Sequence, residues 1–181
     1  MIVRAATEAD ADALAAIYGD AVLHGFGTFE EVPPSPADMD GRRRAVQDMG
    51  LPYLVAELDG QVLGFAYAGP FRPRAAYRYT LEDSVYVSPE AKGQGVGRAV
   101  LSAVIAACEA LGVRQLMAVI GDSGNSGSIG LHRALGFEQT GVGKSVGYKH
   151  GRWVDIVHMQ KPLNGGDGLA PSGPGVTLTG H

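Results

Sequence analysis

The chain has 181 residues, enough for one domain with a buried core, and its 45% apolar and 19% charged residues are typical of a globular protein. The formal net charge of -4 argues against general nucleic-acid binding, which needs a basic surface. The single cysteine excludes a disulfide within the chain, and no apolar stretch is long enough to cross a bilayer. Because the segment after Met1 also lacks the pattern of a signal peptide, we expect a cytoplasmic protein.

The first part of the chain predicts strands and two helices. Thr7 suits the N-cap of a helix that extends to about His24, and Pro36 suits the first turn of a second helix after a loop at 25–30. Asp59-Gly60 is a strong hairpin signal. The expected strands in this part are residues 2–5, 53–58 and 62–68.

The second part predicts a strand at 79–87, a glycine-rich loop, and an amphipathic helix that ends at Gly112. The elements expected after it are a buried strand at 115–120, a short helix at 128–135, and strands at 137–142 and 153–161. From Asn164 onward the chain is rich in glycine and proline and lacks periodicity, so we expect a domain at 1–163 and a disordered tail at 164–181.

The glycine-rich loop is the clearest functional feature. It consists of Lys92, Gly93, Gln94, Gly95, Val96, Gly97 and Arg98, between a strand and a long helix. Glycines let a ligand approach the backbone, and the free amides at a helix start attract anions, so the loop predicts a pyrophosphate site. A tight turn that binds nothing is the alternative interpretation.

Two other phosphate motifs do not fit. The dinucleotide pattern requires a glycine where this loop has Arg98. The fragment Gly143-Lys144-Ser145 matches the end of a P-loop, but Glu138 occupies the place of its first glycine. The sequence therefore supports neither nicotinamide nor ATP binding.

The loop resembles the coenzyme A pyrophosphate loop of the GNAT acetyltransferase superfamily, with Lys92 where Gln or Arg is usual. The order of elements from Ile2 to Lys161 also matches that family. The resemblance implies a mixed, mostly antiparallel α/β sheet flanked by helices, with acetyl-CoA as cosubstrate and no metal.

Four segments resemble the phosphinothricin and methionine sulfoximine N-acetyltransferases of this superfamily: 71–78, 79–87, 131–137 and 147–155. The chain departs from them at Phe71, at Leu81 and through an apparent extra residue in 121–125, next to the family's substrate site. The resemblance implies a homodimer in which Phe26, Thr28 and Phe29 help to shape the partner's site.

Glu82 is the candidate general base, because an amino acid's ammonium must lose a proton before it can attack a thioester. Partial burial in its strand would raise its pKa toward a useful range. The alternative is a solvent-facing glutamate paired with Arg74 or Arg78. His132 occupies the place where many family members have a proton-donating tyrosine, although it would also suit a packed helix residue.

The resemblance assigns further positions to the cosubstrate and the substrate. The backbone of Val85, Tyr86 and Val87 would pair with the pantetheine arm, and the amide near Val87 would face the thioester oxygen. Asn125, which also suits a helix start, and Ser128 are further coenzyme candidates. The candidate substrate residues are Arg72, Arg74, Arg78, Asp83, Ser84, Phe29 and Lys149, while Trp153 is expected in the core.

The function predicted from these features is transfer of acetyl from acetyl-CoA to the α-amine of a small amino-acid-like molecule. One alternative is acetylation of a protein N-terminus or another amine by the same fold. A non-catalytic coenzyme A sensor is the other, and intact Glu82 and His132 argue against it.

Overall fold

A seven-stranded sheet with the order β1-β2-β3-β4-β5-β7-β6 organises the protein. The structure is a computed structural model that describes residues 1–178. Neighbouring strands are antiparallel except β4 and β5, which confirms the predicted mixed sheet. The strands are β1 (Ile2–Ala5), β2 (Tyr53–Leu58), β3 (Gln61–Pro70), β4 (Thr80–Val87), β5 (Gln115–Gly121), β6 (Glu138–Lys149) and β7 (Arg152–Pro162).

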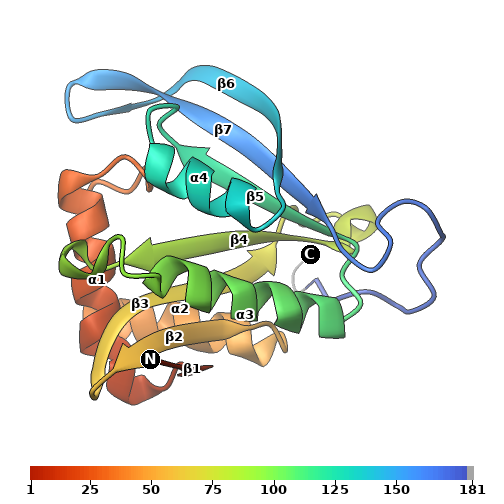
Figure 1. Ribbon diagram of the computed structural model, residues 1–181, viewed down its shortest axis with the longest axis horizontal. Coiled ribbons are helices and arrows are strands. Elements are labelled where there is room, and N and C mark those ends of the chain that lie inside the picture. The colour runs from red at the N-terminus through yellow and green to blue at the C-terminus, as the bar shows by residue number, and fades with distance from the viewer. Residues whose placement is uncertain (179–181) are drawn as a thin grey trace.

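The helices lie on both faces of the sheet (Figure 1). They are α1 (Ala11–His24), α2 (Pro36–Asp48), α3 (Val96–Ala110) and α4 (Ser126–Ala134), with short 3-10 turns η1 (Glu8–Asp10), η2 (Ala75–Tyr77) and η3 (Pro89–Ala91). On one face, α1 and α2 cover a core that includes Leu14, Val22 and Phe65. On the other, α3 packs Leu101 and Val104 against the sheet, and α4 lies beside it.

Local signals in the sequence fix several of these element boundaries. Thr7 and Asp10 form a capping box before α1, and the Ser35 hydroxyl caps α2 through the amide of Asp38. The Asp59-Gly60 hairpin turn is confirmed, because both residues have positive φ values, 53° and 81°.

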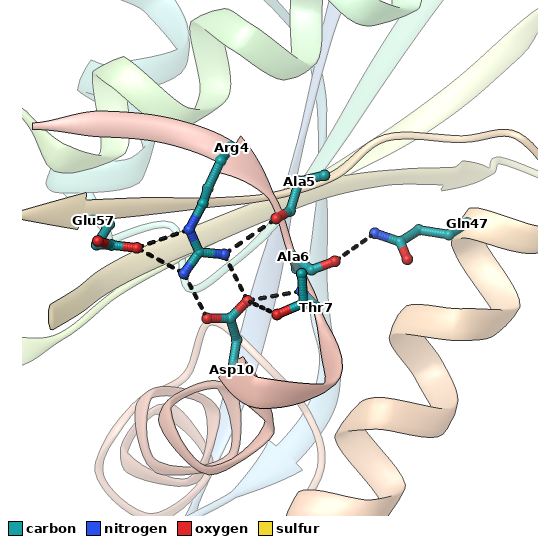
Figure 2. A network of polar contacts seen from close by, with 7 residues as sticks. All are labelled: Arg4, Ala5, Ala6, Thr7, Asp10, Gln47 and Glu57. Atoms are coloured by element: carbon teal, nitrogen blue, oxygen red, sulfur yellow. Dashed lines mark hydrogen bonds and ion pairs between the residues drawn. The ribbon is translucent and has the colours of Figure 1, made fainter. Parts of the chain in front are cut away.

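A polar network ties the start of α1 to the sheet (Figure 2). The Arg4 guanidinium donates two hydrogen bonds of 2.8 Å to the nearly buried carboxylate of Asp10 and one of 2.8 Å to Glu57. Asp10 also accepts from the amide of Thr7. The Arg4 guanidinium therefore bridges β2 and the turn that leads into α1.

The last two strands differ most from the sequence-based expectation. β6 continues to Lys149 instead of ending near residue 142, and it passes the glycine-rich stretch through an irregular register between Gly143 and Gly147. The prediction of a core position for Trp153 is wrong, because this side chain is 62% exposed. It packs edge-to-face against Tyr148 on the same hairpin.

Residues 164–178 contain no helix or strand but make specific contacts with the domain. Arg114 donates hydrogen bonds to the carbonyls of Gly166 and Leu169, and the Val176 amide donates to the carbonyl of Arg78. The segment therefore lies against the start of β4 and the end of α3. The rest of the predicted disordered tail, 179–181, lies outside the described residues. Within residues 1–178, no helix has the length and apolarity to cross a membrane.

Candidate active site

The site begins where the two parallel strands of the sheet separate. β4 and β5 pair over only four residue pairs, from Thr80–Gln115 to Asp83–Ala118. Beyond Asp83 the strands diverge, as Figure 1 shows, while β4 keeps its partner β3 through Val87. A cavity of about 770 Å³ occupies this region, between β4, β5, α1, α3 and α4. One row of backbone groups on β4 beyond Asp83 therefore faces the cavity instead of another strand.

The glycine-rich loop lies at the rim of this cavity. Gly93 and Gly95 have φ values of 79° and 84°, and no atom lies within 4 Å of where a Cβ would be at either position. The Gln94 amide bonds to the carbonyl of Ala91 and the Ala99 amide to that of Gly95, whereas among the described residues the amides of Gly93 and of 95–98 have no backbone partner. Residues 92–98 therefore form a glycine cradle, whose free amides and lack of obstructing side chains fit a diphosphate.

Nearly all of the predicted coenzyme residues line this cavity. They are Val85, Tyr86, Val87, Lys92, Gly93, Gly95, Val96, Gly97, Arg98, Asn125 and Ser128. Gln94 is the exception, since its side chain donates to the carbonyl of Glu90. Asn125 also caps α4, accepting a hydrogen bond from the amide of Ser128, so both interpretations of this residue are compatible with the structure.

The two candidate carboxylates on β4 point to opposite faces of the sheet, because side chains alternate along a strand. Asp83 faces α3 and α4, where its Oδ2 lies 2.9 Å from Nε2 of His132. Both residues are buried, and both line the cavity. Asp83, which was predicted to bind substrate, is therefore held by a side chain of the protein itself.

Glu82 lies on the other face, half-buried, and does not line the 770 Å³ cavity. Burial raises the pKa of Glu82 above its ordinary value, while the positive charge of Arg72 opposes this increase and Asp83 adds to it. Burial raises the pKa of the Tyr67 phenol, and the negative charges of Glu82 and of Glu30, from the loop after α1, add to this increase. A half-buried carboxylate with a raised pKa has the properties of a general base.

The three arginines predicted to bind substrate make different contacts. The charge of Arg72 acts on Glu82, and the Arg72 guanidinium stacks on the ring of Phe71. Arg78 instead bonds to the carbonyl of Ala75 and lies over Tyr79. Arg74 is exposed at the start of η2.

Lys149 and Phe29, two other predicted substrate residues, do not line the cavity but hold the loop at 25–30, part of which does. Lys149 is buried, and its ammonium donates a hydrogen bond of 2.8 Å to the carbonyl of Thr28. The ring of Phe29 packs directly over Gly147, where a Cβ would collide with it. The loop at 25–30 is thus fastened to β6 of the same chain.

Sequence reasoning named Phe26 of this loop but missed Gly27 and the polar contacts behind the loop. Phe26 and Gly27 line the cavity beside Gly121, where a Cβ would overlap the carbonyl of Phe26. Behind them, Glu30 accepts hydrogen bonds from the Tyr18 hydroxyl and from Arg42, which lowers the pKa of this carboxylate. The partners come from three separate segments, so no local sequence signal identified them.

No cluster of three or more His, Cys, Asp or Glu side chains within residues 1–178 is arranged to hold a metal ion.

Comparison with known proteins places this site in a family. The family model for the acetyltransferase (GNAT) family matches residues 20–137. The chain is 57% identical to a phosphinothricin N-acetyltransferase of Alcaligenes faecalis, over 93% of this chain and 86% of that protein. It is 42% identical to an L-methionine sulfoximine/L-methionine sulfone acetyltransferase of Pseudomonas paraeruginosa, over 90% of this chain and 94% of the relative.

A solved structure agrees with these relatives. A phosphinothricin acetyltransferase of the GNAT superfamily from Sinorhizobium meliloti, crystallised in complex with AcCoA, superimposes with a TM-score of 0.91 at 49% identity. The match covers 94% of this chain and 92% of that one. The chain therefore belongs to the GNAT family and is an acetyl-CoA-dependent N-acetyltransferase.

Proposed function

We propose that the protein acetylates the α-amine of a small amino acid of the methionine sulfoximine and phosphinothricin class. One observation carries this proposal: the cavity extends from the glycine cradle to the separation of β4 and β5, where it is lined by Asp83, the neighbour of the half-buried Glu82 in β4. Such a cavity suits a long, thin cosubstrate whose thioester ends at the strand separation. The names of the relatives at 57% and 42% identity support the substrate class.

Glu82 is proposed as the general base of a direct transfer. Its carboxylate takes one proton from the substrate ammonium, directly or through a water, and the freed nitrogen lone pair attacks the thioester carbonyl. The amide near Val87 stabilises the negative charge that develops on the carbonyl oxygen. The C–S bond then breaks with its electron pair on sulfur, the nitrogen gives its second proton to water to form the neutral amide, and a proton from His132 completes the thiol. The raised pKa of Glu82 supports the first step.

The deciding experiment is steady-state kinetics with acetyl-CoA and a panel of amino acids with their sulfoximine, sulfone and phosphinate analogues, with an N-terminal peptide included. Glu82→Gln should lower kcat by about 10²–10⁴-fold and leave the KM for acetyl-CoA nearly unchanged. Glu138→Gln, on the exposed start of β6, is the matched control. Turnover of the peptide alone would favour a protein acetyltransferase, and coenzyme binding without any turnover would favour a sensor.

We also propose a homodimer in the cytoplasm. A group of exposed apolar side chains on the β6–β7 hairpin supports the dimer: Val142, Val146, Tyr148 and Trp153. Phe29 is exposed beside Gly147 on the same hairpin, which agrees with a shared site. Analytical ultracentrifugation should give a dimer for the wild type and a monomer for a Tyr148→Ser, Trp153→Ser double variant. The single cysteine agrees with a reducing compartment.

A further inference from the structure

The buried pair of Asp83 and His132 has a hydrogen-bond arrangement that fixes where its protons lie. Nδ1 of His132 is 2.8 Å from the main-chain carbonyl of Ser128, one turn earlier in α4. A carbonyl oxygen carries no hydrogen, so Nδ1 must be the donor in this contact, which is shorter than the 3.4 Å between Nδ1 and the Ser128 hydroxyl. Nε2 is 2.9 Å from Oδ2 of Asp83, so this second contact also needs one proton between its two atoms.

When Asp83 is a carboxylate, the imidazole of His132 therefore carries both protons, one on Nδ1 and one on Nε2. The side chains of both residues are almost completely buried, at 3% and 0% exposure. A buried carboxylate needs a positive partner, and Nε2–H of His132 supplies one. Burial alone would lower the pKa of His132, but the hydrogen bond and the charge of Asp83 outweigh it and raise the pKa.

The pair lies at a defined place, the point where β4 and β5 separate. Asp83 is the last residue of β4 that pairs with β5, so it marks the inner end of the gap between the strands. Both side chains line the cavity there. Oδ1 of Asp83 is buried and has no hydrogen-bond partner among the described residues, so it is available to a group inside the cavity.

Few other titratable groups surround the pair. Cys108 of α3 is near enough to sense the charge of Asp83, but burial raises the pKa of its thiol to about 12, so it remains neutral. Glu82 of β4 senses the same charge from the opposite face of the sheet. On the α4 side, the ring of Phe137 packs edge-to-face against His132 with 5.0 Å between ring centres. The imidazole therefore has Asp83 as its charged partner.

We infer that Asp83 is a positioning residue that keeps His132 doubly protonated at the inner end of the gap, so that the pair stores the proton taken up by the departing coenzyme A thiolate. This inference rests on the proposed acetyl transfer. As the C–S bond breaks, an S–H bond forms and the Nε2–H bond breaks, leaving its electron pair on nitrogen. The products are a thiol, a neutral imidazole that keeps its Nδ1–H bond to Ser128, and a carboxylate that has lost its hydrogen bond from Nε2, which favours uptake of a new proton by the pair. Water entering through the cavity returns the proton before the next cycle.

The first test measures His132 without turnover. In protein labelled with ¹⁵N-histidine, and with the His132 signals assigned from His132→Gln, both ring nitrogens of the wild type should be protonated at pH 7. In Asp83→Asn the titration midpoint of His132 should fall by at least one pH unit, because burial remains and the negative charge is gone. Asp12→Asn, at an exposed position of α1, should leave the midpoint unchanged. An unchanged midpoint in Asp83→Asn would overturn the inference.

The second test links the pair to the reaction. With the amino acid that turns over fastest, the alkaline limb of the kcat–pH profile should move to lower pH in Asp83→Asn together with the His132 midpoint, and kcat at pH 8 should fall at least tenfold. The KM for acetyl-CoA should stay within twofold. A midpoint that moves while the alkaline limb stays fixed would refute the role in thiolate protonation. If no amine is acetylated, the proposed function fails, whereas the NMR titration still decides whether Asp83 sets the protonation of His132.

Discussion

The ammonium of Lys149 and the main-chain carbonyl of Thr28, 121 residues apart in sequence, are joined by a buried hydrogen bond of 2.8 Å. This bond fastens the loop at 25–30 to the end of β6. Because Phe26 and Gly27 of that loop line the cavity, the bond fixes one wall of the site. It has a direct consequence for substrate binding.

Lys149→Met keeps most of the side-chain volume but removes the donor, leaving the Thr28 carbonyl unsatisfied. The free energy of unfolding, measured in urea, should fall by about 1–3 kcal/mol. The KM for the amino acid should rise more than the KM for acetyl-CoA, because the loosened loop also carries Glu30, whose charge acts on Tyr67 together with that of the proposed base Glu82. Lys144→Met, which removes an exposed ion pair with Asp155 on the same hairpin, should lower the free energy of unfolding much less than Lys149→Met does and leave both KM values unchanged. A larger effect on acetyl-CoA would contradict this role for Lys149.

Arg72 should tune the pH dependence of catalysis through Glu82. Its positive charge opposes the increase in pKa that burial imposes on Glu82, so removing that charge should raise the pKa further. Since a general base must be ionised to accept a proton, the acid limb of kcat/KM should move to higher pH in Arg72→Gln. Arg44→Gln, on the exposed face of α2, is the control. An acid limb that moves to lower pH would show that Arg72 does not act on the base.

Gly95 should be needed for the shape of the glycine cradle. At φ 84° a side chain is strained by about 1–2 kcal/mol, so Gly95→Ala should distort the loop where its amides converge. Calorimetry should show the dissociation constant of coenzyme A rising by about tenfold, the equivalent of 1.4 kcal/mol. Gly130→Ala, in the exposed middle of α4, provides the comparison and should bind normally. Equal affinities would remove the loop from the binding site.

The network of Arg4 and Asp10 should make stability depend on pH. The hydrogen bonds from Arg4 hold the pKa of Asp10 below its ordinary value. A lowered folded-state pKa means that the stabilisation is present above pH 3.8 and is lost as the pH falls through the folded-state value. Asp10→Asn should therefore cost about 2 kcal/mol at pH 7 and less at pH 3. Urea unfolding at both values checks this, and an equal cost at both would contradict it.

The sequence predicted the fold well wherever a boundary is set by local chemistry. The Asp59-Gly60 turn, the cap at Thr7, Pro36 in the first turn of α2 and the glycine loop before α3 all act within a few residues of their own position. β6 was predicted too short because its glycines are typical of a loop, whereas pairing with β7 carries the strand past them to Lys149. Trp153 was placed in the core because an aromatic residue in a strand favours burial, and nothing local indicates an outer face.

The sequence predicted which residues belong to the candidate site but not which of their side chains contact one another. Because side chains alternate along β4, Glu82 and Asp83 point to opposite faces of the sheet. Asp83 can therefore bond to His132, which is 49 residues away in sequence. Likewise, Tyr18, Glu30 and Arg42 meet only because α1 and α2 lie on the same face of the sheet. Pairings of this kind depend on three-dimensional packing, which a single sequence does not specify.

The short run of paired residues between β4 and β5 also affects the mechanics of the protein. Strands β1–β4 and strands β5–β7 are joined along only four residue pairs, with helices α3 and α4 bridging one side. A cosubstrate lying in the gap contacts both blocks and resists their moving apart. Heat resistance should therefore increase with the concentration of coenzyme A, and amide exchange along β4 beyond Asp83 should slow when the gap is filled.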